Sequence, residues 1–562
     1  MLPPSEIEKR AAEQRRRLKP VLVVFCVAWL VRLIHIFSLK ASPIFDYKIG
    51  DAARYDAWAR TLAEGNWIGE GVFYQAPLYP YFLGLIYSTL GDSLMTVRLV
   101  QSLLGAGSCV LLMLAATRFF GKRSGWISGL FLAFYAPSIF LEGLIQKSTL
   151  DLFFLTLLLW LISKIAFRPR PRQWIWMGVA TGALCLTREN ALVLIPVFLF
   201  WIALGWFKPQ AKSLGIQPSI SGIKNRLQWS AAFALGLVLT LGPVALRNYY
   251  VGGQLHLTTS QLGPNFYIGN NPAANGTYRP LLPGRGDAQY EQKDAVALAE
   301  KEMGKKLSPK EVSNFYLAKS FDFIQQQPGK WLGLMTFKFG LTFNRQELID
   351  TEDQYTVAQV SPILLCADTV FNFGLLVPLA IIGMIVTRSR WQRLWVLYLI
   401  MLSFAVTVIA FFVFGRYRFP LAPVMMLFVG PALLFFGDQF RKPESRKLVA
   451  AAAAFALLFL GCNLDLVSNK TGPGVTLSNY GVQAMIRSDY TNAERFLLAS
   501  ESMMPENPLV HNNMGVLYRE TNRLQLAKSH FEKALALEPT DQKIQSNLEK
   551  LDALIQVSTD SH

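Results

Sequence analysis

Long apolar runs, separated by short basic segments, constrain this chain more than any other feature of its sequence. Each run is close to the roughly 20 residues that an α-helix needs to cross a bilayer. With 52% hydrophobic residues over 562 positions, such runs are typical of a membrane protein with many spans. We therefore predict an all-α, polytopic helix bundle with about eleven membrane-spanning helices. The predicted spans are 20–39, 93–117, 124–140, 144–166, 174–188, 190–206, 229–248, 362–387, 394–414, 418–437 and 447–466.

The positions of the basic residues indicate how these spans are oriented. The formal net charge of +17 is compatible, on its own, with binding to nucleic acid. Lys and Arg nevertheless concentrate in short segments between the apolar runs, which is typical of cytoplasmic loops and not of a nucleic-acid surface. We therefore expect contact with membrane lipid, no nucleic-acid partner, and a basic cytoplasmic N-terminus over residues 1–19.

One short apolar segment decides which loops face outward. Residues 77–91 form an apolar stretch of about fifteen residues that contains two prolines, which is shorter than a crossing needs. We place it as a helix at the outer interface, and every later basic loop then faces the cytoplasm. The outer loops of the membrane domain (20–466) become 40–92 and 249–361.

The tail beyond the last span is repetitive. The second copy of the repeat resembles the tetratricopeptide consensus, so we predict a helical repeat domain over 474–556. Two repeats and a closing helix are fewer than an independent solenoid usually contains. We expect this tail to pack on the membrane domain or on a protein partner. The pairs separated by 34 positions, the tetratricopeptide period, are Gly481 and Gly515, Ala493 and Ala527, and Pro505 and Pro539.

The stretch after the first span combines an amphipathic pattern with an acid. Tyr55, Trp58 and Leu62 share one helix face, so residues 51–64 are predicted to form a short helix on the outer membrane surface. Asp51 stands at its N-terminal end, where it can serve as an ordinary N-cap. A carboxylate at the mouth of a membrane protein also suits general-base chemistry. This residue alone leaves both interpretations open.

Further polar residues from distant parts of the sequence are predicted to face outward. Charge near hydrocarbon is costly and usually functional, so these residues are candidates for catalysis or substrate binding. Simpler roles exist, because Glu142 can cap a helix hairpin and Lys147 is spaced to pair with Asp151. The arginines at 416 and 418 break the positive-inside pattern, which favours an anion site. The candidates are Asp51, Tyr55, Glu142, Lys147, Arg188, Asn270, Arg416 and Arg418.

Several of these residues lie in motifs that resemble a known family. Asp51-Ala-Ala-Arg54-Tyr55, followed by Ala59-Arg60 and Gly65-Asn66-Trp67, resembles the first-loop motif of protein O-mannosyltransferases and of the bacterial aminoarabinose transferase. These enzymes are GT-C glycosyltransferases. The 75–79 turn, the Glu142 loop and the 415–420 turn are also similar to bacterial members. The resemblance extends over about residues 20–440.

The resemblance implies a membrane glycosyltransferase that moves a sugar from a polyprenyl-phosphate donor to a glycan, lipid or protein acceptor, with inversion. Asp51 would be the base, Glu142 an auxiliary acid or a group that orients the acceptor, and Arg416 with Arg418 the phosphate clamp. The remaining candidates would bind substrate. The implied location is a bacterial inner membrane with the tail in the periplasm. Ala52 stands where relatives often have a second acid, so no metal site is predicted, although a divalent cation is kept open as a cofactor.

Two other interpretations stay open. An oligosaccharide ligase or polymerase would use outer arginines with a His or Glu and would not need Asp51. A non-enzymatic scaffold for envelope assembly would act through the tail, so deletion of 474–562 would abolish its function while Asp51→Asn would be silent. A transporter is disfavoured, because the charged residues gather on one face rather than at mid-membrane.

The predicted topology places the tail outside the cytoplasm. A reporter that is active only outside the cytoplasm, fused after residue 470, is therefore expected to be active. The same reporter fused after Arg168, in a predicted cytoplasmic loop, serves as the control and should be inactive. An inactive reporter at 470 beside a control that behaves as expected would contradict the assignment.

Overall fold

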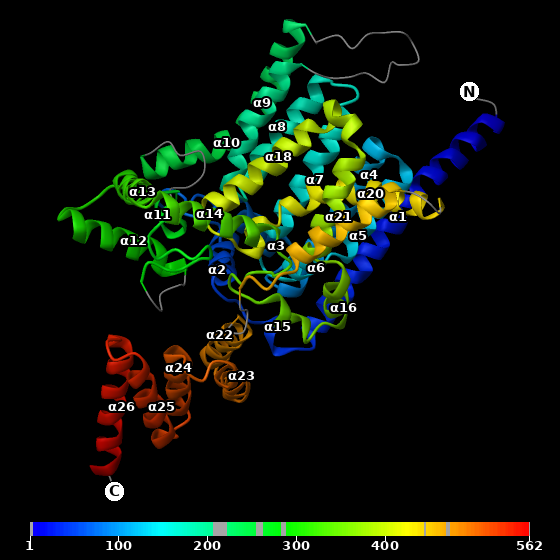
Figure 1. Cartoon of the computed structure of the whole chain (residues 1–562). Coiled ribbons are helices and arrows are strands. Elements are labelled where there is room, and N and C mark those ends of the chain that lie inside the picture. Colours follow the sequence, from blue (N-terminus) through cyan, green and yellow to red (C-terminus); the bar gives the residue numbers. More distant parts are fainter. Residues whose placement is uncertain are drawn as a thin grey trace.

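The computed structural model describes residues 4–205, 222–253, 262–282, 288–442, 446–467 and 472–560. Within these ranges the chain forms helices and turns without a strand, which confirms the all-α prediction (Figure 1). The start of the predicted N-terminal segment and parts of the predicted outer loop 249–361 lie outside the described residues.

Six helices of the described chain are long and apolar enough to cross a membrane, so this is a multi-pass membrane protein. Two bent helix pairs raise the number of candidate spans to eight: α5 (Lys122–Phe134) with α6 (Ala136–Gly143), at 49°, and α16 (Pro362–Val370) with α17 (Phe373–Val386), at 41°. The six are α1 (Pro4–Lys40, apolar from Leu18), α4 (Leu94–Phe120), α7 (Ser148–Ile165), α10 (Ile223–Gly252), α18 (Trp391–Ala410) and α20 (Leu421–Phe440).

The predicted count of eleven spans is not confirmed. The other three predicted spans correspond to α8 (Pro171–Cys185), α9 (Leu194–Leu204) and α21 (Arg446–Cys462), which are only 15, 11 and 17 residues long. Glycines still fix α8 tightly against α10, because a Cβ on Gly178 would lie 2.2 Å from the carbonyl oxygen of Phe233. Such close approach is typical of helix pairs in membranes.

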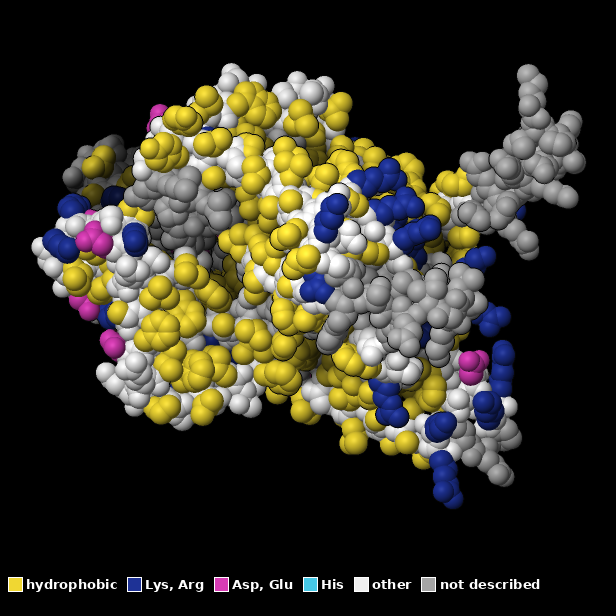
Figure 2. Space-filling view, turned by 90° about the horizontal axis from the view of Figure 1, so that it is seen from above, with side chains coloured by type: hydrophobic (Ala, Val, Ile, Leu, Met, Phe, Trp, Pro, Cys, Tyr) yellow, Lys and Arg dark blue, Asp and Glu magenta, His cyan; other side chains and the backbone are white. Residues whose placement is uncertain are grey.

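Basic segments meet at one end of the bundle. Arg390 donates from Nη1 to the carbonyl oxygen of Phe119 over 2.9 Å, and the Arg393 guanidinium lies 4.6 Å from the centre of the Phe167 ring. Loops that are distant in sequence therefore lie together. Seen from above, the molecule carries Lys and Arg side chains among hydrophobic ones, with few Asp and Glu (Figure 2). This is the distribution that the positive-inside rule expects on one side of a membrane.

The predicted amphipathic helix is α2 (Asp51–Ala63). Its buried face carries Tyr55 and Leu62 and packs on α3 (Leu78–Leu90), where Tyr79 and Leu83 are also buried. Trp58 stands to one side and packs against Phe73, with 5.2 Å between ring centres. The helical period of the apolar residues thus predicted both the helix and its buried face.

The outer loop is also helical where it is described. It contains α11 (Leu262–Gly269), α12 (Ala288–Met303), α13 (Pro309–Gln326) and α14 (Pro328–Phe343). Lys338 of α14 is buried and donates to the carbonyl oxygens of Gly269 and Phe411, at 2.7 and 2.5 Å. This ammonium group therefore fastens the loop to the outer end of α18.

The tail consists of α22 (Gly472–Ile486), α23 (Tyr490–Met503), α24 (Pro508–Glu520), α25 (Leu524–Leu537) and α26 (Gln542–Asp560). The same contact recurs in both copies. A Cβ on Gly481 would lie 2.6 Å from Leu497, and a Cβ on Gly515 would lie 2.6 Å from Phe531. Each glycine lets its two helices meet, which explains the 34-residue period.

The tail packs on the membrane domain, as expected, below the bundle in Figure 1. Tyr47 lies between Tyr480 and Phe496 of the tail, with ring centres 6.0 and 6.2 Å away. The Tyr480 hydroxyl donates to Glu352 over 2.8 Å, and Arg487 donates to the backbone oxygen of Asp46 over 2.6 Å. The tail therefore lies on the same side as the loop that carries Asp51.

Tyr47→Ala should loosen the tail, because it removes an aromatic side chain from the shared cluster. We expect a loss of docking free energy of about 3 kcal/mol, measured as faster hydrogen exchange of the α22 amides. Tyr250→Ala is the control, since the Tyr250 side chain is 81% exposed. Equal exchange in both variants and the wild type would show that Tyr47 does not hold the tail.

Candidate functional site

The predicted outer side of the bundle carries a cluster of mostly buried polar groups from distant segments. Arg416 lies in the short helix α19 (Gly415–Arg418), between α18 and α20. Its Nη1 is 2.8 Å from Asp51 Oδ2, and its Nη2 is 2.8 Å from Asp350 Oδ2. Gln75 Nε2 donates to the other oxygen of Asp51 over 2.8 Å. We call Asp51, Gln75, Asp350 and Arg416 the acid–arginine cluster.

The local backbone brings the two carboxylates together. Asp51 begins α2 directly after Gly50, whose φ of +54° lies in the left-handed region that favours glycine. A Cβ on Gly50 would lie 2.7 Å from Cγ2 of Thr351. The chain that follows Asp350 therefore passes closely over the entry to α2, and substitution of Gly50 would separate the two acids.

Hydrogen bonds to the backbone of α19 hold Arg416 in place. Arg188 Nη2 donates to the carbonyl oxygen of Arg416 over 2.9 Å, while Asp151 pairs with Arg188 at 2.9 Å. Gly415 N donates to the carbonyl oxygen of Leu348 over 3.1 Å, which ties α19 to the segment before Asp350. Arg188 thus positions Arg416, and its predicted contact with substrate stays untested.

Lys147 is not paired with Asp151, so that expectation is wrong. Asp151 is satisfied instead by Arg188, a tertiary partner 37 positions away. The Lys147 ammonium lies 3.9 Å from a carboxylate oxygen of Glu189, and its positive charge also acts on both carboxylates of the cluster. Lys147 stays a predicted substrate-binding group.

The two carboxylates on Arg416 differ in their affinity for protons. Burial alone raises the pKa of both groups. At Asp51, the charge and hydrogen bond of Arg416 outweigh burial, with help from Lys147 and Gln75, and hold the pKa below the usual range for Asp. At Asp350 burial prevails, and the charge of Asp51 adds to it, so the pKa is raised. Asp51 is therefore the stronger acid of the pair and loses its proton at a lower pH than Asp350 does.

Arg416 has one donor that it does not use. Its side chain is only 6% exposed, and Nε is buried without a hydrogen-bond partner among the described residues. A buried donor without a partner is costly. The cluster can therefore accept one more hydrogen-bond acceptor, and the charge of Arg416 favours an anion.

Tyr55 lies at the base of this cluster. Its side chain is 1% exposed, and its ring meets Tyr79 edge-on with 5.2 Å between centres. Tyr417 lies beside Arg416, whose guanidinium carbon is 5.6 Å from the centre of the ring. Aromatic packing thus holds the charged groups in place, while contact of Tyr55 with substrate stays a prediction.

Glu142 does not join the cluster. Its two carboxylate oxygens are 2.6 and 2.8 Å from the Arg32 guanidinium, and Ser138 donates to it over 2.5 Å. The Glu142 side chain is 1% exposed. The pair links α6 to α1 inside the bundle, so we correct the prediction that Glu142 assists catalysis.

Arg418 and Asn270 are also committed to structural contacts. Arg418 pairs with Glu347 at 2.8 Å and donates to backbone oxygens that include those of Asn344 and Gln346. Asn270 donates to the carbonyl oxygens of Phe266 and Ala410 and accepts from Trp331. Both side chains are buried. Arg418 and Asn270 are thus engaged in contacts within the protein, and their predicted roles in binding substrate stay untested.

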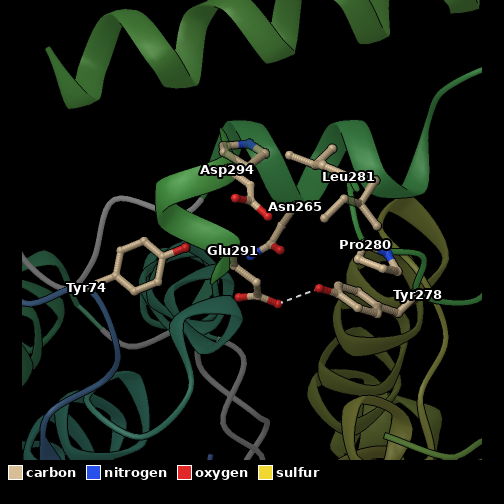
Figure 3. Close-up of a pocket in the computed structure, with 9 residues that line it drawn as sticks. Tyr74, Asn265, Tyr278, Pro280, Leu281, Glu291 and Asp294 are labelled. Carbon is tan, nitrogen blue, oxygen red and sulfur yellow. Dashed lines mark hydrogen bonds between the residues drawn. The ribbon is translucent and has the colours of Figure 1, made fainter. Parts of the chain in front are cut away.

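A cavity beside the cluster is lined by a further acid, Glu291. Glu291 of α12 accepts a hydrogen bond of 2.8 Å from Tyr278, and both side chains face Tyr74 across the cavity (Figure 3). Burial raises the pKa of Glu291 to about 7, and the charges of Asp51 and Asp350 add to the effect. Because Tyr74 directly precedes Gln75, this cavity adjoins the acid–arginine cluster.

Two further cavities border the cluster. One is lined by apolar residues of α6, such as Phe140 and Leu141, and reaches Asp350 and Arg416. The other is open and polar, and its lining includes Gln75 and Arg54 together with aromatic side chains. The first cavity is lined by apolar and charged residues, among them Glu347 and Glu352, and the second by arginines and aromatic side chains, so both lie beside the same charged cluster.

Two acids of this site, Asp350 and Glu291, were not among the residues predicted from the sequence. Asp350 belongs to the acidic run 347–353, whose crowding of charge after an apolar helix was the available signal. Glu291 lies on a polar helix that carries several acids and offers no local signal. The prediction that a divalent cation assists stays untested. In the described chain, the one group of three His, Cys, Asp or Glu side chains that can share a cation lies in the tail.

Comparisons with known proteins match two parts of the chain. Residues 74–221 match the family model described as dolichyl-phosphate-mannose-protein mannosyltransferase, and residues 508–541 match the tetratricopeptide repeat. The predicted resemblances are confirmed over these ranges. The first match covers about a quarter of the chain and begins after Asp51. A search of curated proteins found no match.

Comparison with solved structures also gave matches, each with a TM-score below 0.5. An oligosaccharyltransferase of Archaeoglobus fulgidus has 12% identity and a TM-score of 0.37, covering 84% of this chain and 58% of its own. AglB from the same organism, in complex with dolichol-phosphate, has 14% sequence identity and a TM-score of 0.37, and the match covers 85% of this chain and 60% of AglB. ArnT from Cupriavidus metallidurans, bound to undecaprenyl phosphate, has 14% sequence identity and a TM-score of 0.33, and the match covers 74% of this chain and 78% of ArnT. The chain thus spans about three fifths of the archaeal enzymes' length.

Glu142→Gln should destabilise the bundle, because it leaves the buried charge of Arg32 without its counter-charge. We expect a loss of about 3 kcal/mol, measured as a lower midpoint of thermal unfolding in detergent. The double variant Arg32→Met/Glu142→Gln removes the stranded charge and should recover much of that loss. A double variant no more stable than Glu142→Gln would contradict the assigned pairing.

Proposed function

We propose that this chain is a membrane glycosyltransferase that moves a sugar from a polyprenyl-phosphate donor to an acceptor on the non-cytoplasmic side. The observation that carries the proposal is the contact between Asp51 and Arg416, 365 positions apart, with a spare buried donor on Arg416. The family match over 74–221 supports the same reaction class. In this proposal, the neighbouring cavities select which hexose or pentose is transferred and which acceptor receives it.

Asp51 acts as the general base in this proposal. An acceptor hydroxyl attacks the anomeric carbon of the donor, its proton passes to the Asp51 carboxylate, and the bond from that carbon to the phosphate oxygen breaks. Because the acceptor enters opposite the leaving phosphate, the sugar carbon inverts. The low pKa of Asp51 keeps it ionised and able to accept the proton.

Arg416 stabilises the departing lipid phosphate. The phosphate gains negative charge as the bond breaks, and a guanidinium can meet it with parallel hydrogen bonds. Nε, which has no partner within the described chain, is available without breaking the contact to Asp51. The cavity that reaches Arg416 also borders Asp350, and we place the donor phosphate beside it.

Donor binding also strengthens the base. Arg416 lowers the pKa of Asp51, so an Asp51 that faces Arg416 alone is a weak base. A bound phosphate offsets part of the positive charge, and the pKa of Asp51 then rises toward its usual range. The carboxylate therefore becomes a better proton acceptor when the donor is in place.

The open cavity beside Gln75 is where we place the acceptor. It is lined by Arg54 and by the aromatic residues Trp58, Phe73 and Tyr74, which present hydrogen-bonding groups and flat surfaces to a polar ligand. We propose a bacterial inner-membrane protein with this cavity and the tail in the periplasm, the tail binding a protein partner. The described contacts between the tail and Tyr47 support a common side for both.

Purified protein should release lipid phosphate from one of a panel of polyprenyl-phosphate hexoses and pentoses when an acceptor extract is present. Asp51→Asn should lower the rate by about 10²–10⁴-fold, and Arg416→Gln by a similar factor. Asp46→Asn is the matched control, because its carboxylate is exposed in the same loop. Release that is equal in Asp51→Asn and Asp46→Asn would remove Asp51 from the mechanism.

The scaffold alternative gives the opposite pattern in cells. Deletion of 474–562 would then abolish the envelope phenotype, and Asp51→Asn would leave it intact. The enzymatic proposal instead requires that Asp51→Asn alone abolish the phenotype at normal protein abundance.

A further inference from the structure

Three metal-ligand side chains meet between the two repeats of the tail. His511 Nδ1 lies 3.2 Å from His530 Nδ1 and 3.5 Å from Glu501 Oε1, and the three donor atoms all lie within 4.8 Å of one another. They come from α23, α24 and α25. His511 is fully buried, and the other two are half-buried.

The hydrogen bond on the far side of His511 fixes which nitrogen is free. His511 Nε2 lies 2.8 Å from the carbonyl oxygen of Pro505. A carbonyl oxygen can only accept, so Nε2 carries the hydrogen and neutral His511 presents the lone pair of Nδ1 to His530 and Glu501. A backbone carbonyl that orients the outer nitrogen in this way is typical of metal-binding histidines.

The repeat pattern does not explain these residues. The positions 34 residues away in the other copy are Leu477 for His511, Phe496 for His530 and Leu535 for Glu501. All three equivalents are apolar, so packing of the repeat needs hydrophobic side chains there. Two imidazoles whose nitrogens face each other at 3.2 Å need a proton or a cation between them.

We propose that Glu501, His511 and His530 form a zinc site that joins the two tetratricopeptide copies. Ligands at 2.0–2.1 Å around a tetrahedral zinc ion lie about 3.3 Å apart, close to the 3.2 and 3.5 Å found here. Two imidazoles favour zinc or its neighbours over calcium and magnesium, which prefer oxygen. Three protein ligands leave a fourth position for water or for a side chain of a partner protein.

The side chains of Lys533 and Tyr518 lie next to the proposed zinc ligands. The Lys533 ammonium lies 3.9 Å from Glu501 Oε1 but is half-exposed, so it can move away when a cation binds. The ring of Tyr518 lies 5.3 Å from that of His530.

The site has a structural consequence for a short repeat array. Glu501 belongs to the first copy, whereas His511 and His530 belong to the second. A bound ion would therefore fasten the first copy, which packs on the membrane domain, to the second. An array of two copies has few neighbouring repeats to stabilise it. A bound ion would stabilise the contact between the two copies.

Tag-free, full-length protein in detergent tests this site with Zn²⁺ and Co²⁺. After incubation with micromolar Zn²⁺ and desalting, the wild type should retain about one zinc per chain, and Co²⁺ should give the intense visible bands of a tetrahedral site. His530→Gln and Glu501→Gln should each weaken zinc binding by more than about 100-fold in calorimetry. Glu506→Gln, an exposed acid in the same turn, should bind like the wild type.

Circular dichroism on each variant separates loss of ligand from loss of fold. Zinc should raise the unfolding temperature of the wild type and of Glu506→Gln but not that of folded His530→Gln. Zinc retained equally by wild type and His530→Gln, or no zinc retained by the wild type, would overturn the proposal. Neither result depends on transferase activity, so the site stands or falls separately from the proposed function.

Discussion

Arg416 is the group on which the outer side of this protein depends. It holds a carboxylate from the first outer loop and another from the segment before α15 (Gln354–Ala358), and its position is fixed by Arg188. A guanidinium removed from water is costly unless it is paired. Two acids offset that cost, and Asp51 binds a proton less tightly than Asp350 does. The result is a preassembled site with an unused donor, and the proposed chemistry uses that donor.

The tail is attached close to both of these acids. Asp46 and Tyr47, which contact the tail, lie a few residues before Asp51, and Glu352, which accepts from Tyr480, lies two residues after Asp350. The repeat domain thus holds the two chain segments that bring the carboxylates together. A partner bound to the tail would act on the same segments, which gives a physical route from the repeats to the site.

Local patterns predicted the elements, whereas tertiary partners decided the roles of the charged residues. The helical period of Tyr55 and Leu62 predicted α2 and its buried face because that information lies within a few turns. Glu142 was expected at the site, but its partner Arg32 lies on the first helix, and no local pattern links the two. Lys147 and Asp151 have the spacing of a helical pair, yet Arg188 provides a better buried partner. Asp350 was visible only as one acid among several, since its importance comes from Arg416.

The most direct test of this account is the dissociation constant of undecaprenyl phosphate. In the account, the lipid phosphate and the Asp350 carboxylate both interact with the positive charge of Arg416 and therefore compete for it. Asp350→Asn should therefore tighten binding, while Arg416→Gln should weaken it by about tenfold or more. Binding that is unchanged in Arg416→Gln, or weakened in Asp350→Asn, would contradict the central role of Arg416.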